Sequence, residues 1–413
     1  MRTPKKSALR PSSRPAERRG DDAIWPRVTR ELADDLAFDA PARDRAGKPP
    51  FDEVARLREA GLPGLLTPPG EGGRGAGWRA ACAVLREISA ADSSIGELLA
   101  HHHALAWSAR FLGPPHTAFE DATAREGRLL AGGIEPSHTG RELTLTRARG
   151  GRVLAGRRAF DSGVTVADRL VVGARCRETG DLLVVLVDPA DPAVFVEAAA
   201  DRIGQRLSGA GTVTFDQLRI DARDVLGSLP RDEHAVTPFT LLAPLALRLL
   251  LVHVGLGTAE GALAEARDVS RATRATPPAS DPADQEDPYL LLTYGELVTA
   301  AHAAAAIVER ATDALAGGLA AGQTLGVAER ADIAVLVAAA EAVTNWAALR
   351  ITTRILELAD ATGTADNPGG DPGFDRFWRN ARTLTAHSSS AHRLRDIGDH
   401  YLHGTRPGLR LLA

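Results

Sequence analysis

The spacing of apolar residues changes twice along this chain of 413 residues, and the changes divide it into three parts. Residues 25–128 have apolar positions three and four apart, which predicts an N-terminal helical domain. Residues 129–236 hold short runs of Val, Leu, Thr and Phe between Gly, Asp and Pro, which predicts a small β-domain of antiparallel, barrel-like character. Residues 237–413 return to helical spacing and are rich in Ala, which predicts a C-terminal four-helix bundle. We therefore expect a mainly α protein with a β-domain in the middle.

Individual elements follow from the same spacing. The helices predicted before the β-domain cover residues 28–42, 51–60, 78–89 and 93–112. The predicted strands cover residues 142–147, 152–155, 169–174, 182–187, 194–197 and 213–219. The predicted bundle helices cover residues 241–273, 288–316, 331–358 and 374–387. Asp92 and the two serines after it form an N-cap for the helix at 93–112, and Gly150-Gly151 predicts a hairpin turn.

Composition excludes several classes of protein. Lys+Arg number 49 against 53 Asp+Glu, a net charge of −4, so we expect neither nucleic acid nor an anionic membrane as a partner. No run of about 18 apolar residues is free of charge, which predicts no membrane span. Cys82 and Cys176 lie far apart without a CxxC companion, which excludes a disulfide scaffold and a zinc ribbon and favours a reducing compartment. Residues 1–24 lack the apolar segment of a secretory signal, and we expect a disordered basic tail.

The predicted helix at 374–387 carries an unusual set of polar side chains. Arg379, Arg382 or Thr383, and His387 fall on one face at helical spacing. Isolated charges are costly to bury, so we expect an anion, a cofactor edge or another subunit opposite that face. The alternative is a solvated basic helix, against which Trp378 and its two neighbouring Phe residues argue.

Other polar stretches allow two interpretations each. His101, His102 and His103 point in three directions on a helix, so they predict no metal site, and each either lines a pocket or lies on the surface. The Gly-rich and Pro-rich residues 65–75 lack the Lys-Ser/Thr ending of a phosphate-binding loop. Residues 160–163 and 204–212 are polar loops at strand ends, and they are either site loops or simple turns.

Taken in order, these stretches resemble the acyl-CoA dehydrogenase family across nearly all of residues 25–413, and within it the flavin-dependent monooxygenases typified by dibenzothiophene and sulfone monooxygenases. The matching stretches are LREAGL at 57–62, GGRG at 72–75, ADSSIG at 91–96, FDSG at 160–163 with AD at 167–168, GQR at 204–206, DPY at 287–289 with YGE at 294–296, and DRFWRNART at 375–383 followed by His387. Their order and spacing are specific, whereas each motif alone is weak.

The resemblance implies a two-component (group D) monooxygenase. A separate flavin reductase supplies reduced FMN, with FAD as a further possibility, and O2 adds at C4a to give a hydroperoxide that oxygenates a small organic substrate. Ser162 inherits the role of hydrogen-bond partner of that hydroperoxide. His387 becomes the group that protonates or stabilises it, a task that suits an imidazole because its pKa lies near neutrality. The family also implies a cytoplasmic homotetramer, a dimer of dimers.

Further site residues follow from the same resemblance. Arg274 would bind the flavin phosphate, from its own or a neighbouring subunit, and Arg379 would be a second phosphate or interface contact. Gly163 and Glu135 would contact the cofactor. The residues expected to face the substrate pocket are Glu97, His101 and His102. Relatives often have His and Tyr at the first two of these positions, so the acid/base groups of this pocket differ from theirs.

Two alternatives remain at this stage. An acyl-CoA dehydrogenase would need a carboxylate base beside a tightly bound FAD, and residues 358–374 contain no Glu, although Glu296 and Glu341 on other helices stay open. A non-catalytic flavin-binding relative is the second alternative. The presence of Ser162, Arg274 and His387 together argues against it.

Overall fold

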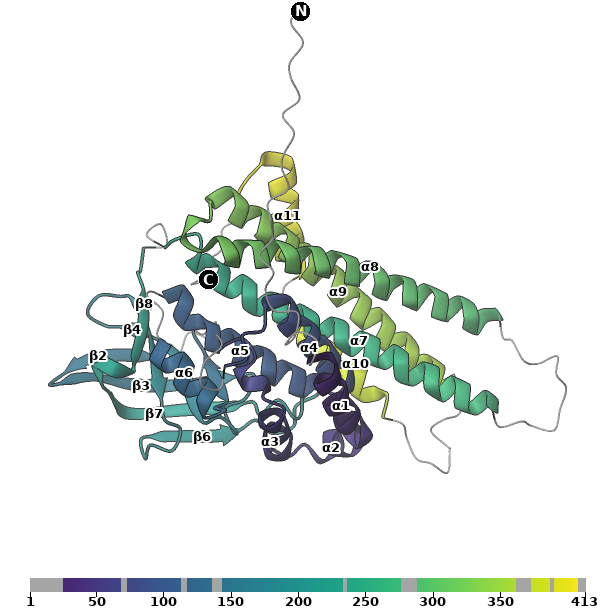
Figure 1. The fold of residues 1–413 in the computed structure, drawn as a ribbon, viewed down its shortest axis with the longest axis horizontal. Coiled ribbons are helices and arrows are strands. Elements are labelled where there is room, and N and C mark those ends of the chain that lie inside the picture. Colours follow the sequence, from purple (N-terminus) through teal and green to yellow (C-terminus); the bar gives the residue numbers. More distant parts are fainter. Residues whose placement is uncertain are drawn as a thin grey trace, which may run out of the picture.

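The computed structural model describes residues 25–67, 73–112, 117–135, 143–232, 236–275, 288–361, 373–386 and 390–407. Along the chain one β-sheet follows an N-terminal helical region and precedes a C-terminal one. This is the predicted order of helical domain, β-domain and helical bundle. Figure 1 shows the sheet at one side of the molecule, with the long helices of the C-terminal region extending away from it.

Helices form the whole N-terminal region. Their bounds are α1 (Trp25–Phe38), α2 (Ala40–Ala46), α3 (Phe51–Glu59), the 3-10 turn η1 (Leu62–Gly64), α4 (Trp78–Ala91), α5 (Ser93–Leu112) and α6 (Thr117–Arg125). The bounds predicted for α5 are confirmed, and Asp92 Oδ1 accepts hydrogen bonds from the backbone N–H groups of Ser94 and Ile95. The single helix predicted at 28–42 is wrong, because the chain breaks at Asp39 and restarts with Pro41 in the first turn of α2.

The β-domain is one eight-stranded sheet. Its strands are β1 (Leu130–Gly133), β2 (Thr144–Ala148), β3 (Gly151–Phe160), β4 (Arg169–Cys176), β5 (Leu182–Val187), β6 (Val194–Ala198), β7 (Gly211–Ile220) and β8 (Val225–Leu229). The path is β6-β7-β3-β2-β4-β5-β8, with β1 beside β4. The predicted hairpin joins β2 to β3. The predicted antiparallel character is only partly correct, because β4 pairs in parallel with both β1 and β2.

In the described part of the C-terminal region, three α-helices are long and two are shorter. They are α7 (Ala243–Ala275), α8 (Pro288–Ala321), α9 (Val327–Ala361), α10 (Asp375–Ala386) and α11 (Ser390–His403). The helix predicted at 374–387 is α10, with 12 residues. The predicted fourth helix is therefore confirmed over residues 375–386, and α11 was not expected. Helix α10 packs against α7, α9 and α5.

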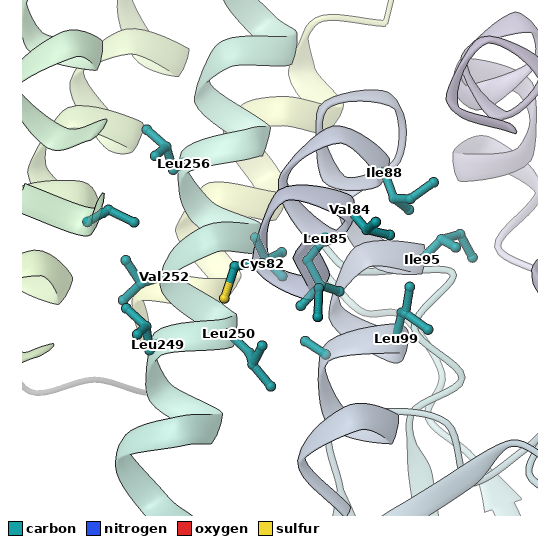
Figure 2. Packing of buried hydrophobic residues seen from close by; sticks show 14 of the residues in the cluster. Cys82, Val84, Leu85, Ile88, Ile95, Leu99, Leu249, Leu250, Val252 and Leu256 are labelled. Atoms are coloured by element: carbon teal, nitrogen blue, oxygen red, sulfur yellow. The ribbon is translucent and has the colours of Figure 1, made fainter. Parts of the chain in front are cut away.

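The N-terminal helices and the bundle share one hydrophobic core. Figure 2 shows α4, α5 and α7 meeting through side chains that include Leu85, Leu99 and Leu250. The approach of α7 to α4 is close enough to require glycine, since a Cβ on Gly261 would lie 2.0 Å from the carbonyl oxygen of Ala90. The β-domain has its own core, centred on residues such as Val172 and Phe215. The sheet is therefore a separate packing unit held against an all-helical one.

Three helical segments are long and apolar enough to cross a membrane by length and composition alone: Thr240–Ala272, Tyr289–Thr324 and Val327–Leu358. The expectation of no membrane span rested on the lack of a charge-free apolar run, and each of these segments contains charged residues, so the expectation stays a prediction. The first and third bury 61% and 56% of their apolar windows inside the protein, and the second buries 22%. Core packing thus accounts for the apolar character of α7 and α9, whereas much of α8 stays exposed.

Candidate active site

Two loops of the β-domain, at residues 161–166 and 204–209, are joined by hydrogen bonds and lie beside α5 and α10. The buried Ser162 hydroxyl donates a hydrogen bond to the Ser208 carbonyl oxygen at 3.1 Å, and the Gly163 N–H donates to the same oxygen at 2.7 Å. Gly163 has φ +78°, and a Cβ there would lie 2.8 Å from the Ala131 Cβ. Glycine is therefore required, and the loop places Ser162 at a fixed position.

Gln205 ties these loops to the helices. It is buried and has φ +54°, a left-handed conformation that is unfavourable for a side chain. Its N–H donates to Asn380 Oδ1 on α10 at 2.7 Å, and its Nε2 donates to Ser93 Oγ on α5 at 2.8 Å. The hydroxyl oxygens of Ser93 and Thr258 on α7 lie 2.7 Å apart. The network joins three helices to the loop whose Ser208 carbonyl holds Ser162.

Glu97 lies one turn after Ser93 on α5 and is 4% exposed. Within the described part of the chain, its Oε2 has no hydrogen-bond partner. Burial raises the pKa of this carboxyl to about 8, while Arg202 lowers it and Asp161 raises it. Glu97 is therefore a neutral acid at pH 7, close to the residue that precedes Ser162.

Arg158 is a candidate site residue that the sequence analysis did not name. It lies on β3, two positions before Phe160, and its guanidinium carbon is 5.0 Å from the centroid of that ring. Its Nη1 donates to the Gly133 carbonyl oxygen at 3.3 Å. Burial lowers the pKa of Arg158, and the carboxylates of Glu135 and Asp161 oppose that effect. Its place on the strand that leads into the Ser162 loop is the sequence signal that could have identified it.

The three histidines of α5 separate as a helix requires. His102 is fully buried, its Nε2 lies 2.8 Å from the Pro63 carbonyl oxygen, and its Nδ1 accepts from the Leu130 N–H at 3.0 Å. Burial lowers the pKa of His102 to about 4. Both nitrogens of the neutral ring are engaged by backbone, so His102 fixes β1 against η1 and has no nitrogen left for a substrate. His101 is half-buried on the neighbouring face.

Two of the three arginines of α10, Arg376 and Arg379, pair with carboxylates of the same chain. Arg379 donates to Asp44 Oδ2 at 2.5 Å, to Asp375 Oδ2 at 2.9 Å and to the Ile203 carbonyl oxygen at 2.9 Å. Arg376 is buried and pairs with Glu265 on α7. The expectation of an anion opposite this helix is confirmed. Carboxylates of the same chain supply that anion for Arg379, and its expected contact with a flavin phosphate or a neighbouring subunit stays a prediction.

Two expected site residues are beyond what the structure can place. His387 follows the end of α10 and lies outside the described residues. Arg274 belongs to the last turn of α7, and only its backbone is described. Their expected roles toward the peroxide and the phosphate stay predictions. No group of three or more His, Cys, Asp or Glu side chains that could hold a metal occurs among the described residues.

Comparison with known proteins agrees with this architecture. Residues 21–113 and 249–391 match the N-terminal and C-terminal domains of acyl-CoA dehydrogenase. The chain is 31% identical to a probable FMNH2-dependent monooxygenase from Pseudomonas putida, covering 92% of this chain and 95% of that protein. It is 32% identical to dibenzothiophene monooxygenase from Rhodococcus erythropolis, covering 95% and 96%.

A solved structure shows the same likeness in three dimensions. The Paenibacillus sp. A11-2 protein TdsC, in complex with FMN and indole, superposes with a TM-score of 0.85 at 28% identity, covering 94% of this chain and 99% of that one. Sequence and structure agree over almost the whole length, including the β-domain that carries the Ser162 loop. The chain therefore belongs to the acyl-CoA dehydrogenase family, in its branch of flavin-dependent monooxygenases.

Proposed function

We propose that this protein is the oxygenase of a two-component system that uses reduced FMN from a separate flavin reductase, together with O2, to oxygenate a small organic substrate. The observation that carries the proposal is the full-length similarity to FMNH2-dependent and dibenzothiophene monooxygenases. Bound reduced FMN would supply the two electrons that activate O2, and O2 would supply the oxygen atom that is transferred. The protein's own side chains bind the partners, exclude water and manage protons.

The polar atoms around the two site loops fit a flavin ring. Within the described residues, Glu97 Oε2, Gln205 Oε1 and Thr165 Oγ1 are buried without hydrogen-bond partners. Buried polar atoms are costly to leave unpaired, and the ring edge of a flavin presents both donors and acceptors. Thr165 belongs to the same loop as Ser162, and its backbone N–H donates to the Gly209 carbonyl oxygen. The atoms of Gln205 and Thr165, with Gly163 and Glu135, would line the cofactor, whereas Glu97 would face the substrate.

Ser162 is suited to accepting a hydrogen bond. A serine hydroxyl has one proton, and here the Ser208 carbonyl oxygen takes it. The remaining lone pairs can receive a proton donor, such as an N–H of reduced FMN or an O–H of the oxygenating group. Arg274 toward the phosphate and His387 as the proton donor complete the proposed set.

The sequence left Glu296 and Glu341 as candidate bases for an acyl-CoA dehydrogenase, and both are held in ion pairs. Glu341 is 10% exposed and accepts from Arg248 Nε at 2.9 Å. Glu296 lies on the exposed side of α8 and pairs with Arg350 at 2.6 Å. A carboxylate held by an arginine in an ion pair is not free to reach the α-carbon of a substrate. Neither residue is therefore the base that such an enzyme needs.

The test measures how the protein handles reduced FMN. Anaerobically reduced FMN is mixed with the protein in aerated buffer, and hydrogen peroxide release is followed beside the absorbance of oxidised flavin. We expect the protein to slow peroxide release relative to free flavin, and Ser162→Ala to restore fast release. Ser228→Ala, an exposed serine on β8, is the matched control. Unchanged peroxide release, together with reduction of protein-bound FAD by butyryl-CoA, would replace the monooxygenase with a dehydrogenase.

We further propose a homotetramer, a dimer of dimers, that works in the cytoplasm. Its support is the apolar surface of α8, where Tyr289, Leu291 and Leu292 are 78%, 51% and 61% exposed. Two free, buried cysteines are compatible with a reducing compartment. Light scattering tests the assembly: Leu292→Glu should reduce the mass of the particle, whereas Gln323→Glu, past the end of α8, should not. A monomeric wild-type protein would contradict the proposal.

A further inference from the structure

A cavity of about 470 Å³ lies between α4, α7 and α8, and no described residue of the candidate active site lines it. Its lining includes the buried side chains of Cys82 on α4, His253 on α7 and Thr312 on α8. Cys82 lies between α4 and α7 (Figure 2). The cavity has the volume of a typical small-molecule site, and Ala83 and Ala90 leave it open because each extends only a methyl group. It is therefore a candidate for a second ligand.

His253 gives the cavity an unused hydrogen-bond acceptor. The Thr312 hydroxyl donates its proton to the Val308 carbonyl oxygen at 2.8 Å, so its oxygen accepts from His253 Nε2, also at 2.8 Å. Burial lowers the pKa of His253 to about 3, so the ring is neutral and Nδ1 carries a lone pair. His253 is 4% exposed, and its Nδ1 has no hydrogen-bond partner among the described residues. Since native proteins rarely leave such an atom unpaired, a ligand group that donates a hydrogen bond is expected there.

The charged side chains around the cavity carry an excess of carboxylates. Four carboxylates line it, against the two guanidinium groups of Arg79 and Arg86. Both arginines are engaged, because Arg86 Nε donates to Glu260 Oε2 at 2.6 Å and Arg79 Nε donates to Asp313 Oδ1 at 2.5 Å. Glu309 on α8 forms no ion pair within the part of the chain that the structure describes. An anionic ligand would therefore find no free guanidinium here, whereas a cation would find a free carboxylate.

We propose that this cavity binds a small organic cation whose N–H groups donate to His253 Nδ1 and to the carboxylate of Glu309. Glu309 precedes Thr312 by three positions on α8, so the carboxylate and the partner of His253 lie on the same helix face. An amidinium or guanidinium group fits this pair of acceptors, because it presents several N–H donors and no acceptor. Its apolar body packs against the methyl groups of Ala83 and Ala90. The inference goes beyond the proposed function, since the cavity takes no part in the oxygenation.

Calorimetry with three probes of one shape tests the proposal. Benzamidine, benzamide and benzoate are titrated at pH 7 into the full-length protein loaded with oxidised FMN. They share a phenyl ring and differ in charge and in donor groups. We expect benzamidine to bind about ten-fold more tightly than benzamide, which is the difference between a charge-assisted and a neutral hydrogen bond. Benzoate should bind most weakly, because both guanidinium groups are engaged. Equal affinities for benzamidine and benzamide, or tightest binding of benzoate, would overturn the inference.

The variants place the binding in this cavity. Ala83→Leu fills the space and should abolish benzamidine binding. Glu309→Gln should weaken it about three-fold, and His253→Phe about ten-fold. Asp332→Asn, an exposed acid on α9 that does not line the cavity, should leave the affinity unchanged. Ala83 and Glu309 are exposed, so their variants should fold even if His253→Phe does not, and circular dichroism checks this. Unchanged benzamidine affinity in Ala83→Leu would move the binding elsewhere and overturn the inference.

The proposed function is tested by a different signal. Peroxide release from reduced FMN should be the same in Ala83→Leu as in wild type, because the cavity lies outside the candidate active site. Faster release in that variant would join the cavity to the active site and overturn the inference of a separate site. If benzamidine binding is lost in Ala83→Leu while wild type releases peroxide as fast as free flavin, the cation site stands and the oxygenase assignment fails.

Discussion

Helices α10 and α5 both bury polar side chains next to the Gln205 loop, and they treat them in opposite ways. On α10, Arg376 pairs with Glu265, and Asn380 accepts from the Gln205 N–H. On α5, Glu97 Oε2 and both ring nitrogens of His103 have no partner among the described residues. The polar side chains of α10 connect this helix to α7 and to the Gln205 loop. On α5, Glu97 and His103 are buried without such partners in the described part of the chain, although Ser93 and His102 are paired.

The physical difference is whether desolvation is compensated. A buried charge loses its hydration, and only a well-placed opposite charge restores that loss. On α10 the partners come from α2 and α7, so the helix locks the N-terminal region to the bundle. Glu97 avoids the cost by staying protonated, since burial raises its pKa to about 8. A group held in that state is ready to exchange its proton when a ligand arrives.

The largest effect is expected for Arg379→Ala. The change leaves Asp44, whose side chain is 6% exposed, without its main partner, because Arg206 is 4.0 Å away. Removing one member of a buried ion pair costs about 3–5 kcal/mol of unfolding free energy. Urea unfolding measures the loss, and FMN affinity should stay unchanged. Arg382→Ala, an exposed position on the same helix, serves as control. A stable variant with weak FMN binding would return Arg379 to the cofactor site.

The pH dependence of the unfolding free energy tests whether Glu97 on α5 is buried as a protonated, unpaired acid. The pKa of Glu97 is about 8 in the folded protein against an ordinary value of 4.5, so between those values the folded state holds a proton that the unfolded chain has lost. The unfolding free energy therefore falls as pH rises through this window. From pH 5 to pH 7 we expect wild type to lose about 2–3 kcal/mol relative to Glu97→Gln. Urea unfolding at each pH measures this, and parallel profiles would show that Glu97 is paired.

The bounds of α5 and α10 could be predicted from the sequence alone. Local signals mark both helices: the Asp92 cap and the apolar spacing for α5, and Gly373 followed by an uninterrupted helical run for α10. Strand β1 was not predicted from the sequence, because it has only four residues and two of them are glycine. Its parallel pairing with β4 depends on Leu130 meeting Arg169, which no local pattern specifies.

The partners of the polar residues were beyond prediction. Arg379 and Asp44 are 335 positions apart, and Gln205 and Asn380 are 175 apart. Charge and helical spacing showed that α10 needs an anion, but they carry no information about which carboxylate the fold delivers. Glu97 was expected in the pocket through family resemblance. Only the structure shows that Glu97 Oε2 has no hydrogen-bond partner among the described residues, and that Arg202 and Asp161 lie close enough to influence its pKa.

Asn380→Ala tests whether pairing on α10 also serves the site. The change removes the acceptor of the buried Gln205 N–H, which costs about 1–3 kcal/mol when a buried donor is left unpaired. The Gln205 loop supplies the Ser208 carbonyl that holds Ser162, so peroxide release from reduced FMN should also become faster. Asn380→Asp keeps an acceptor oxygen and should restore slow release. Loss of stability without any change in peroxide release would confine Asn380 to a structural role.

Arg350→Ala separates burial from pairing and should have the smallest effect. Arg350 on α9 and Glu296 on α8 form an ion pair of 2.6 Å, comparable in length to that of Arg379 with Asp44, but their side chains are 58% and 53% exposed. Water solvates both charges after the pair is broken, so the unfolding free energy should change by about 0–1 kcal/mol. Urea unfolding at low and high salt measures it, and salt should reduce even this difference. A loss as large as that of Arg379→Ala would mean that pairing itself, and not burial, sets the cost. The contrast between α10 and α5 would then need another cause.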